Sequence, residues 1–438
     1  MKNKKNIFIL SILMFTIQLV TAQKSKIEEK KYQRSSLHNI LVVGESFENS
    51  DLVTKNYEAW PFPEKYNDHR IELSSFDRSD YTLTDEEREA LGINKSETNK
   101  MINNALSGAA SNATAGAISN NSEVQYEIDK FINEKKLPFE LVSKWFNLDQ
   151  FDQEDYNPMK LIQDRGAYSA SAQQIAEAKT TTRGINELQN SGKNLIKNTF
   201  VVFTKMNFVS NEPIALAIKQ TTDAAANELS SLARDLALKG SEKIYNKTKE
   251  GYSVWTTAWL YRLDWTEKTW SELGEIIKAK RNGEDITFAS LDVNFEFIGT
   301  EKASSLVTFS LKEKRTEEQI IELSTIRNVD QVYAKLQKNH DVFKPKSPII
   351  IEDGEIYSKI GMKEGLEGGE NFEVLEEIWD SETNDITYKK IASIKVDKKQ
   401  VWDNRYGASE GKEKELGKTL FKGKAKNLAS GMLIRQIK

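Results

Sequence analysis

The chain has 438 residues, which is enough for about two or three domains with cores of their own. It contains no cysteine, and this excludes disulfides, thiolate metal sites and cysteine nucleophiles. Its 62 basic and 66 acidic residues give a net charge of −4, a mixed and mildly acidic balance that disfavours nucleic acid and anionic lipid as main partners.

The first 22 residues have the pattern of a cleaved export signal. Lysines near the start precede an apolar run over 7–20, and Val20-Thr21-Ala22 is a small-residue exit before Gln23. The run is shorter than the roughly 20 residues that span a bilayer. We therefore predict a signal peptide at 1–22 and a mature chain of net charge −7, because three lysines are removed. The mature chain would have no transmembrane anchor and would be periplasmic or peripherally associated with the outer membrane.

The composition of residues 23–122 predicts a polar N-terminal segment, or lead-in, with little regular structure. The segment is interrupted by Pro61 and Pro63, and it contains one apolar strand pattern at 40–43. Residues 103–122 are almost all Asn, Ala, Ser, Gly and Thr. Such a composition has too little apolar bulk to offset the entropy of ordering, which predicts a flexible insert.

Residues 123–342 predict an α+β body. An apolar strand is expected at 199–203, and Pro213 follows Ser210-Asn211 at the start of a long helix. The apolar positions of that helix are Ile214, Ile218, Leu229, Leu232, Leu236 and Ile244. Since its polar face mixes both charge signs, we expect a helix packed on the body rather than one on a membrane surface.

The second half of the body alternates apolar and polar residues as strands do. This pattern covers 253–265, 291–297 and 307–311, and Thr316 with Gln319 forms a capping box before another helix. Strands between a long early helix and a late one predict a mixed, mainly antiparallel sheet.

Residues 343–438 predict a small β-barrel module of about 90 residues. Strand patterns occur at 349–351, 372–378, 386–396 and 432–437, with a hairpin tip at 382–385. The predicted fold is thus α+β: a mixed sheet with long helices, followed by a C-terminal barrel.

Several short segments of the body resemble a family of uncharacterised exported proteins of Gram-negative bacteria. They are Lys144-Trp145-Phe146, Leu161-Ile162, Arg165-Gly166 with Tyr168, Asn198–Val202, and Tyr261-Arg262-Leu263 with Trp265. The resemblance implies export and no assigned activity, and it carries no catalytic residue.

The last block resembles the SH3-like β-barrel of the flagellar-assembly protein T family and related envelope proteins. The residues that carry the resemblance are Ile360-Gly361, Lys363–Leu366, Gly369, Phe372 with Val374, and Gly431-Met432. It implies an SH3-like module for envelope assembly or protein contact.

Two segments are similar to catalytic motifs but lack features that those motifs require. Gly407–Gly411 matches G-x-S-x-G, yet no apolar strand precedes it, and the last histidine, His340, comes before the serine. Residues 411–419 approach a phosphate-binding loop, but five residues separate the glycines, and Glu413 and Glu415 would repel phosphate. We predict no catalytic residue from these motifs.

Metal and cofactor signals are also weak. The three histidines, His38, His69 and His340, have no paired spacing, and the acidic runs at 149–155 and 380–385 lack the pattern of a calcium loop. We therefore predict no metal site and no cofactor. A glycosidase-type carboxylate pair leaves no spacing in a sequence, so that alternative stays open.

Two sets of residues are candidates for binding. A tryptophan beside charge and an Arg-Gly turn are not needed for a core, which favours a specific surface at Lys144, Trp145, Arg165 and Tyr168. Trp255 and Trp259 could stack on a sugar, but the neighbouring Val254, Ala258 and Leu260 make the strand apolar on both faces, which favours burial.

The sequence favours a non-enzymatic cell-envelope protein with an assembly role and an envelope protein as its partner. The alternative is a periplasmic protein that binds or hydrolyses cell-wall glycan through acids of the body and the Trp255/Trp259 face.

Overall fold

The computed structural model describes most of the chain outside the termini and several loops. The described residues are 36–44, 47, 49–61, 67–68, 71–91, 121–167, 180–308, 316–380, 385–408, 416–424 and 426–437. The predicted signal peptide, most of the predicted insert, His69, Tyr168 and Ser409 lie outside these ranges.

A six-stranded mixed sheet forms the centre of the body. Its order is β2 (Asn67–Asp68), β1 (Ser36–Val43), β4 (Thr199–Ser210), β5 (Gly251–Leu263) and β6 (Phe295–Thr308), and β3 (Ser75–Asp77) also pairs with β1. β1 is parallel to β2, β3 and β4, whereas β4, β5 and β6 form an antiparallel meander. The predicted α+β class with a mixed sheet is confirmed.

The strand β1 lies inside this sheet, so its segment is not a separate lead-in. Ser36 is opposite Thr199, and Lys205 is opposite Val42. The helix α2 (Ser50–Glu58) then packs Val53 and Tyr57 into the same core as the sheet. The predicted boundary at residue 122 therefore divides one structural unit.

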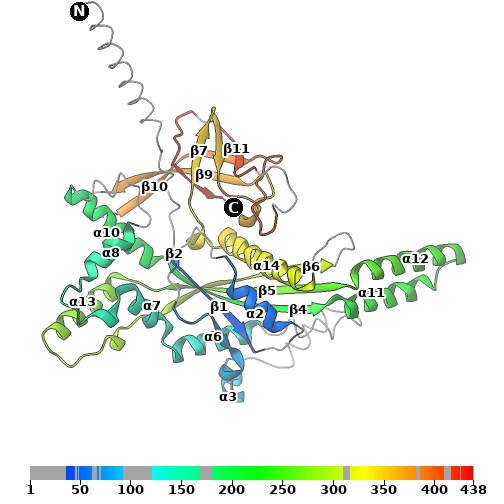
Figure 1. Cartoon of the computed structure of the whole chain (residues 1–438), viewed down its shortest axis with the longest axis horizontal. Helices are drawn as coiled ribbons and strands as arrows, with labels where there is room; N and C mark the ends of the chain where they lie inside the picture. Colours follow the sequence, from blue (N-terminus) through cyan, green and yellow to red (C-terminus); the bar gives the residue numbers. More distant parts are fainter. Residues whose placement is uncertain are drawn as a thin grey trace, which may run out of the picture.

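Helices cover both faces of the sheet because side chains alternate along each strand. On one face, α2 and α14 (Glu317–Asn339) pack against Phe200, Val202 and Leu260. On the other, α6 (Asn121–Glu134) and α7 (Leu137–Phe146) pack against Phe203 and Trp259. Figure 1 shows α14 above the strands and α6 below them.

A third core lies at one end of the sheet, at the left of Figure 1. It is formed by α7, α8 (Pro158–Gly166), α10 (Thr182–Lys197) and α13 (Glu267–Arg281) around Phe146, Trp265 and Leu273. The short helices of the body are η1 (Arg78–Tyr81), α3 (Asp85–Ala90), η2 (Leu148–Gln150), η3 (Phe288–Ser290) and η4 (Asp341–Phe343).

Two helices form a hairpin that extends from the ends of β4 and β5, away from the rest of the body (Figure 1). They are α11 (Asn211–Ala226) and α12 (Ser231–Thr248). The expectation of one long packed helix from Pro213 was wrong in two respects. The helix is interrupted at 227–230, and Leu229, Leu232, Leu236 and Ile244 are exposed.

The C-terminal block is a small closed β-barrel, as predicted. Its strands are β7 (Ser347–Glu352), β8 (Glu355–Ser358), β9 (Asn371–Asp380), β10 (Asp385–Val396), β11 (Thr419–Lys422) and β12 (Leu433–Gln436), closed in the order β10-β11-β8-β7-β12-β9. Its interior holds Ile349, Val374, Ile394 and Phe421. The helix η5 (Met362–Glu364) lies between β8 and β9. Phe343 packs in the body core instead, so the module begins after it rather than at it.

Candidate functional sites

The predicted Trp-Arg surface is a helix-end contact. The guanidinium of Arg165 lies 4.6 Å from the centre of the Trp145 ring. Its Nε donates to the Trp145 carbonyl at 3.0 Å, and its Nη2 donates to the Lys144 carbonyl at 3.2 Å. The structure thus brings Lys144, Trp145 and Arg165 together, but the contact satisfies carbonyls that the end of α7 leaves without helical partners.

Trp145 itself is a core residue. It is 1% exposed, and its Nε1 donates to Thr199 Oγ1 at 3.1 Å. Since the ring is enclosed, it offers no open face to a ligand. Tyr168, the remaining member of the predicted set, lies outside the described residues.

The predicted sugar platform is divided between core and surface. Trp259 is 1% exposed and packs with Phe203 and Tyr261 between the sheet and α6. Trp255 is half-buried and pairs with Asn207 on β4 and Ser304 on β6. The two rings therefore do not form a common exposed surface.

A cleft of about 480 Å³ lies where β1 and β3 end and α2 begins. Its walls include Val43 at the end of β1 and Gly44 after it, Asp51 and Thr54 of α2, and Lys205 of β4. In α/β sheets, ligands bind outside the carboxyl ends of parallel strands, and this cleft has that position. Sequence reasoning missed it. The available signal was an apolar strand followed by Gly44 and a helix start.

The charges around this cleft are balanced. Arg78 forms a bidentate ion pair with the buried Glu127: its Nε donates to Oε2 at 2.6 Å, and its Nη2 donates to Oε1 at 3.0 Å. Burial raises the pKa of Glu127, and Arg78 opposes that rise. Hydrogen bonds from Ser79 lower the pKa of Asp77. With acids and bases of equal number on its walls, the cleft suits a small polar molecule better than a highly charged one.

A glycine is required at the rim of this cleft. Gly44 has φ +114°, and a Cβ there would overlap Asp77 Oδ1 and the Arg78 side chain. The chain can therefore turn from β1 towards α2 beside Asp77 only with glycine at this position.

The barrel is joined to the body through polar contacts with α14. Tyr406 donates to Glu322 at 2.7 Å, and Arg327 Nε donates to the Tyr406 carbonyl at 3.0 Å. Deeper in the joint, Lys363 Nζ lies 3.5 Å from Asp330, which also accepts a hydrogen bond from Trp60 Nε1 at 3.2 Å. Burial raises the pKa of Asp330 to about 6.

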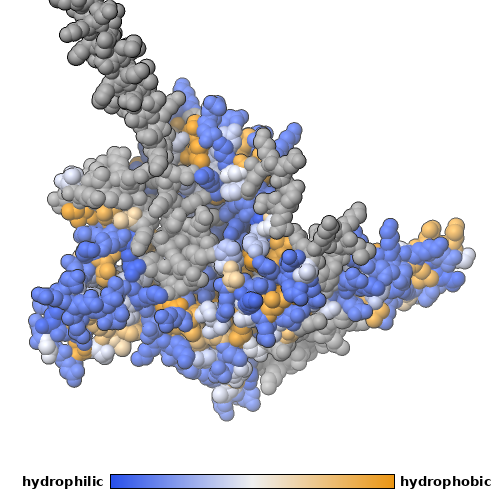
Figure 2. Space-filling view, in the orientation of Figure 1, coloured by the Kyte–Doolittle hydropathy of each residue, from blue (hydrophilic) through white to orange (hydrophobic). Residues whose placement is uncertain are grey.

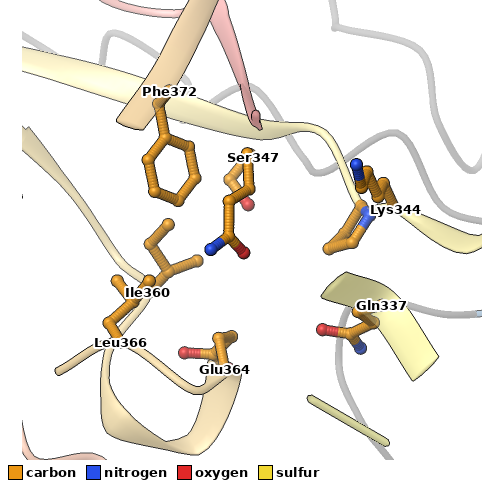
Figure 3. A pocket seen from close by; sticks show the side chains of 9 residues that line it. Gln337, Lys344, Ser347, Ile360, Glu364, Leu366 and Phe372 are labelled. Atoms are coloured by element: carbon orange, nitrogen blue, oxygen red, sulfur yellow. The ribbon is translucent and has the colours of Figure 1, made fainter. Parts of the chain in front are cut away.

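A small cavity lies beside this joint (Figure 3). Its walls come from the end of α14 at Gln337, the connection at Lys344, and the barrel residues Ile360, Leu366 and Phe372. Its volume is about 30 Å³. A water molecule needs roughly 10–15 Å³ by this measure, so the cavity is too small for an organic ligand.

One part of the barrel extends beyond the closed structure. β12 pairs with β9 over Phe372–Leu375, and β11 pairs with β10 at Lys395–Val396. Among the described strands, the outer halves of β9 and β10 pair only with each other, and we call these residues, 376–380 and 385–391, the ribbon. Ile378 and Ile391 of the ribbon are 39% and 36% exposed, and the register shifts at Ile391.

Within the described residues, no three His, Asp or Glu side chains are grouped so as to hold a metal ion. None of the described helices is long and apolar enough to cross a membrane. No protein-family model matches the chain, and no curated protein matches it.

Proposed function

We propose that this protein is a non-enzymatic component of the cell envelope that contacts another envelope protein through its C-terminal barrel. The observation that carries the proposal is the ribbon, which extends past the barrel and exposes Ile378 and Ile391. Two-stranded ribbons are marginally stable alone, and their edges readily accept another chain.

The attachment of the barrel supports this role. Tyr406 and Lys363 of the barrel contact Glu322 and Asp330 of α14. α14 in turn packs Val329, Val332 and Leu336 into the main core of the body. A partner bound at the ribbon would therefore be held in a defined position relative to the body.

The cellular location belongs to the same proposal. The pattern of residues 1–22 is that of an export signal, so we place the protein in the periplasm or on the periplasmic side of the outer membrane. No observation on the described residues favours the wall-glycan alternative, since Trp259 is enclosed in the core.

The test is crosslinking of the full-length protein in living cells. A photoreactive residue is placed at Ile378 or Ile391 in separate variants, and at Val342, which is 40% exposed but belongs to the body side of the joint. We expect both ribbon positions to give an adduct with the same partner and Val342 to give none. Equal labelling from all three positions, or no adduct from the ribbon, would contradict the proposal.

A second variant separates a specific contact from random capture. Ile378→Asp places a charge on the ribbon without touching the barrel interior, since Ile378 is exposed. The adduct formed from position 391 should then fall several-fold. If its yield is unchanged, the ribbon is not the contact surface.

A further inference from the structure

The helix α12 carries an apolar row on its outer face. Leu229, Leu232, Leu236 and Ile244 are 49%, 75%, 67% and 58% exposed. Leu229 lies in the turn before α12, and spacings of four and eight residues place Leu232, Leu236 and Ile244 on one side of the helix. Gly240 continues the row, and a Cβ there would meet nothing within 4 Å. Figure 2 shows hydrophobic surface at the outer end of this hairpin.

A row of lysines runs beside the apolar row. Lys239, Lys243 and Lys247 are all exposed and repeat every four residues, and Asp235 begins the same row. The acids Asp223 and Glu242 are paired with Lys219, at 2.5 Å and 3.2 Å, rather than with this row of lysines. The outward face of α12 therefore combines apolar side chains with a local excess of positive charge, although the whole chain is acidic.

We propose that this face of α12 docks on the surface of a bilayer that contains anionic phospholipid. The apolar row would enter the boundary between headgroups and acyl chains, and the lysine stems would follow it while their ammonium groups reach the phosphates. The helix would lie in the plane of the surface, because its apolar row occupies only one side.

A lipid surface fits this face better than a second copy of the chain. A stable protein interface buries about 800 Å² on each partner, which is more than these four apolar side chains provide. Pairing two such faces would also bring lysine rows together. The hairpin extends away from the rest of the body, so most of α12 is not covered by the central sheet and its helices (Figure 1).

The experiment is cosedimentation of the purified protein with vesicles. Residues 1–22 are omitted, because their apolar run would bind lipid by itself. Vesicles of phosphatidylcholine with about one-third phosphatidylglycerol are compared with vesicles of phosphatidylcholine alone. We expect at least about tenfold tighter binding to the anionic vesicles and a marked loss of binding in high salt.

Two variants test the two halves of the face. Leu232→Ser with Leu236→Ser removes apolar area, and Lys239→Gln with Lys243→Gln and Lys247→Gln removes charge. Each should weaken binding about tenfold or more. The matched controls are Leu91→Ser with Leu416→Ser, and Lys135→Gln with Lys268→Gln and Lys278→Gln, which alter exposed residues elsewhere and should leave binding unchanged.

Three outcomes would overturn the proposal. They are absence of binding to anionic vesicles, binding that both α12 variants retain, and an equal loss of binding in the controls. Light scattering of the protein without lipid completes the test. If the leucine variant converts a dimer into a monomer, the face is an interface between copies rather than a lipid-binding surface.

Discussion

Asp330 is a buried carboxyl group between the body and the barrel, and its environment disfavours the charged form. Trp60 Nε1 and Lys363 Nζ lie near it, at 3.2 and 3.5 Å, but burial dominates and raises its pKa from 3.8 to about 6. Between these two values the folded protein binds a proton that the unfolded chain releases. Stability therefore falls as pH rises from about 4 to about 6.

The first prediction concerns this pH dependence. Keeping Asp330 ionised costs on the order of 3 kcal/mol above pH 6, and Asp330→Asn removes that cost. Relative to the wild type, the variant should gain unfolding free energy between pH 4.5 and pH 7.5, measured by urea denaturation. Asp77→Asn should show no such gain between pH 4.5 and pH 7.5, because the pKa of Asp77 is lowered in the folded protein and its stabilisation is lost only below about pH 4. Parallel profiles for wild type and Asp330→Asn would contradict the assignment.

Single residues also show what could not be predicted from the sequence. Lys144, Trp145 and Arg165 were singled out because a core does not need them in that order, and the structure does bring them together. A sequence does not show that the guanidinium is used on the carbonyls of α7, since these two helices meet only through tertiary packing. The burial of Trp259 was predictable from its apolar neighbours on both strand faces.

At the scale of helices, α8 and α10 are in backbone contact through two glycines. A Cβ on Gly166 would overlap the Leu188 carbonyl oxygen, and one on Gly192 would overlap the Ile162 carbonyl oxygen. Helix axes this close require the absence of side chains at the crossing. Each glycine carries the conformational cost of its place in a helix because the packing needs it.

The second prediction follows from this crossing. Gly192→Ala should lower the unfolding free energy by at least about 2 kcal/mol, because the helices must separate. Gly274→Ala in α13 is the matched control, since a Cβ there meets nothing within 4 Å. It should raise stability by up to about 1 kcal/mol. Urea denaturation of the two variants distinguishes the cases, and equal effects would disprove the close approach.

The hairpin of α11 and α12 shows what helical periodicity predicts. Apolar spacing and Pro213 indicated helix correctly, and most of 211–248 is helical. The same spacing suggested a buried face, but periodicity indicates only that a face needs a partner. Leu232 and Leu236 lack one within the described part of the chain, so they remain 75% and 67% exposed.

At the scale of the whole molecule, Phe343 marks where the body ends. It is 1% exposed, and its ring lies 4.9 Å from that of Phe200 and 6.4 Å from that of Tyr333. The Pro-containing segment that follows suggested a boundary at 343, because composition changes there. The aromatic contacts move the boundary past Phe343.

The third prediction tests this boundary. Phe343→Ala should destabilise the body by about 3–5 kcal/mol, as deletion of a fully buried ring does. Val342→Ala, at a neighbouring residue that is 40% exposed, should cost less than about 1 kcal/mol. Protection of amide hydrogens from exchange in α14 and β4 provides the measurement. A loss confined to the barrel would show that Phe343 belongs to the module after all.

For the sheet of the body, the mixed class was predicted from the sequence, but the order of its strands was not. The barrel strands follow local alternation and turns, and these were visible in the sequence around 349–351 and 372–378. The pairing of β1 with β4 does not follow from such local patterns. Ser36 meets Thr199 across a long stretch of chain, and no local pattern specifies which distant strand a parallel strand will join.

That pairing has a consequence for how the chain acquires its structure. The meander β4, β5 and β6 is built from nearer neighbours, and β2 and β3 follow β1 closely in the chain, whereas the long pairing of β1 with β4 needs residues from 199 on. Contacts between such distant residues slow folding, because the entropy of closing a large loop is lost before the contact forms. β1 is thus synthesised before β4, and its pairing with β4 is expected to form later than the meander.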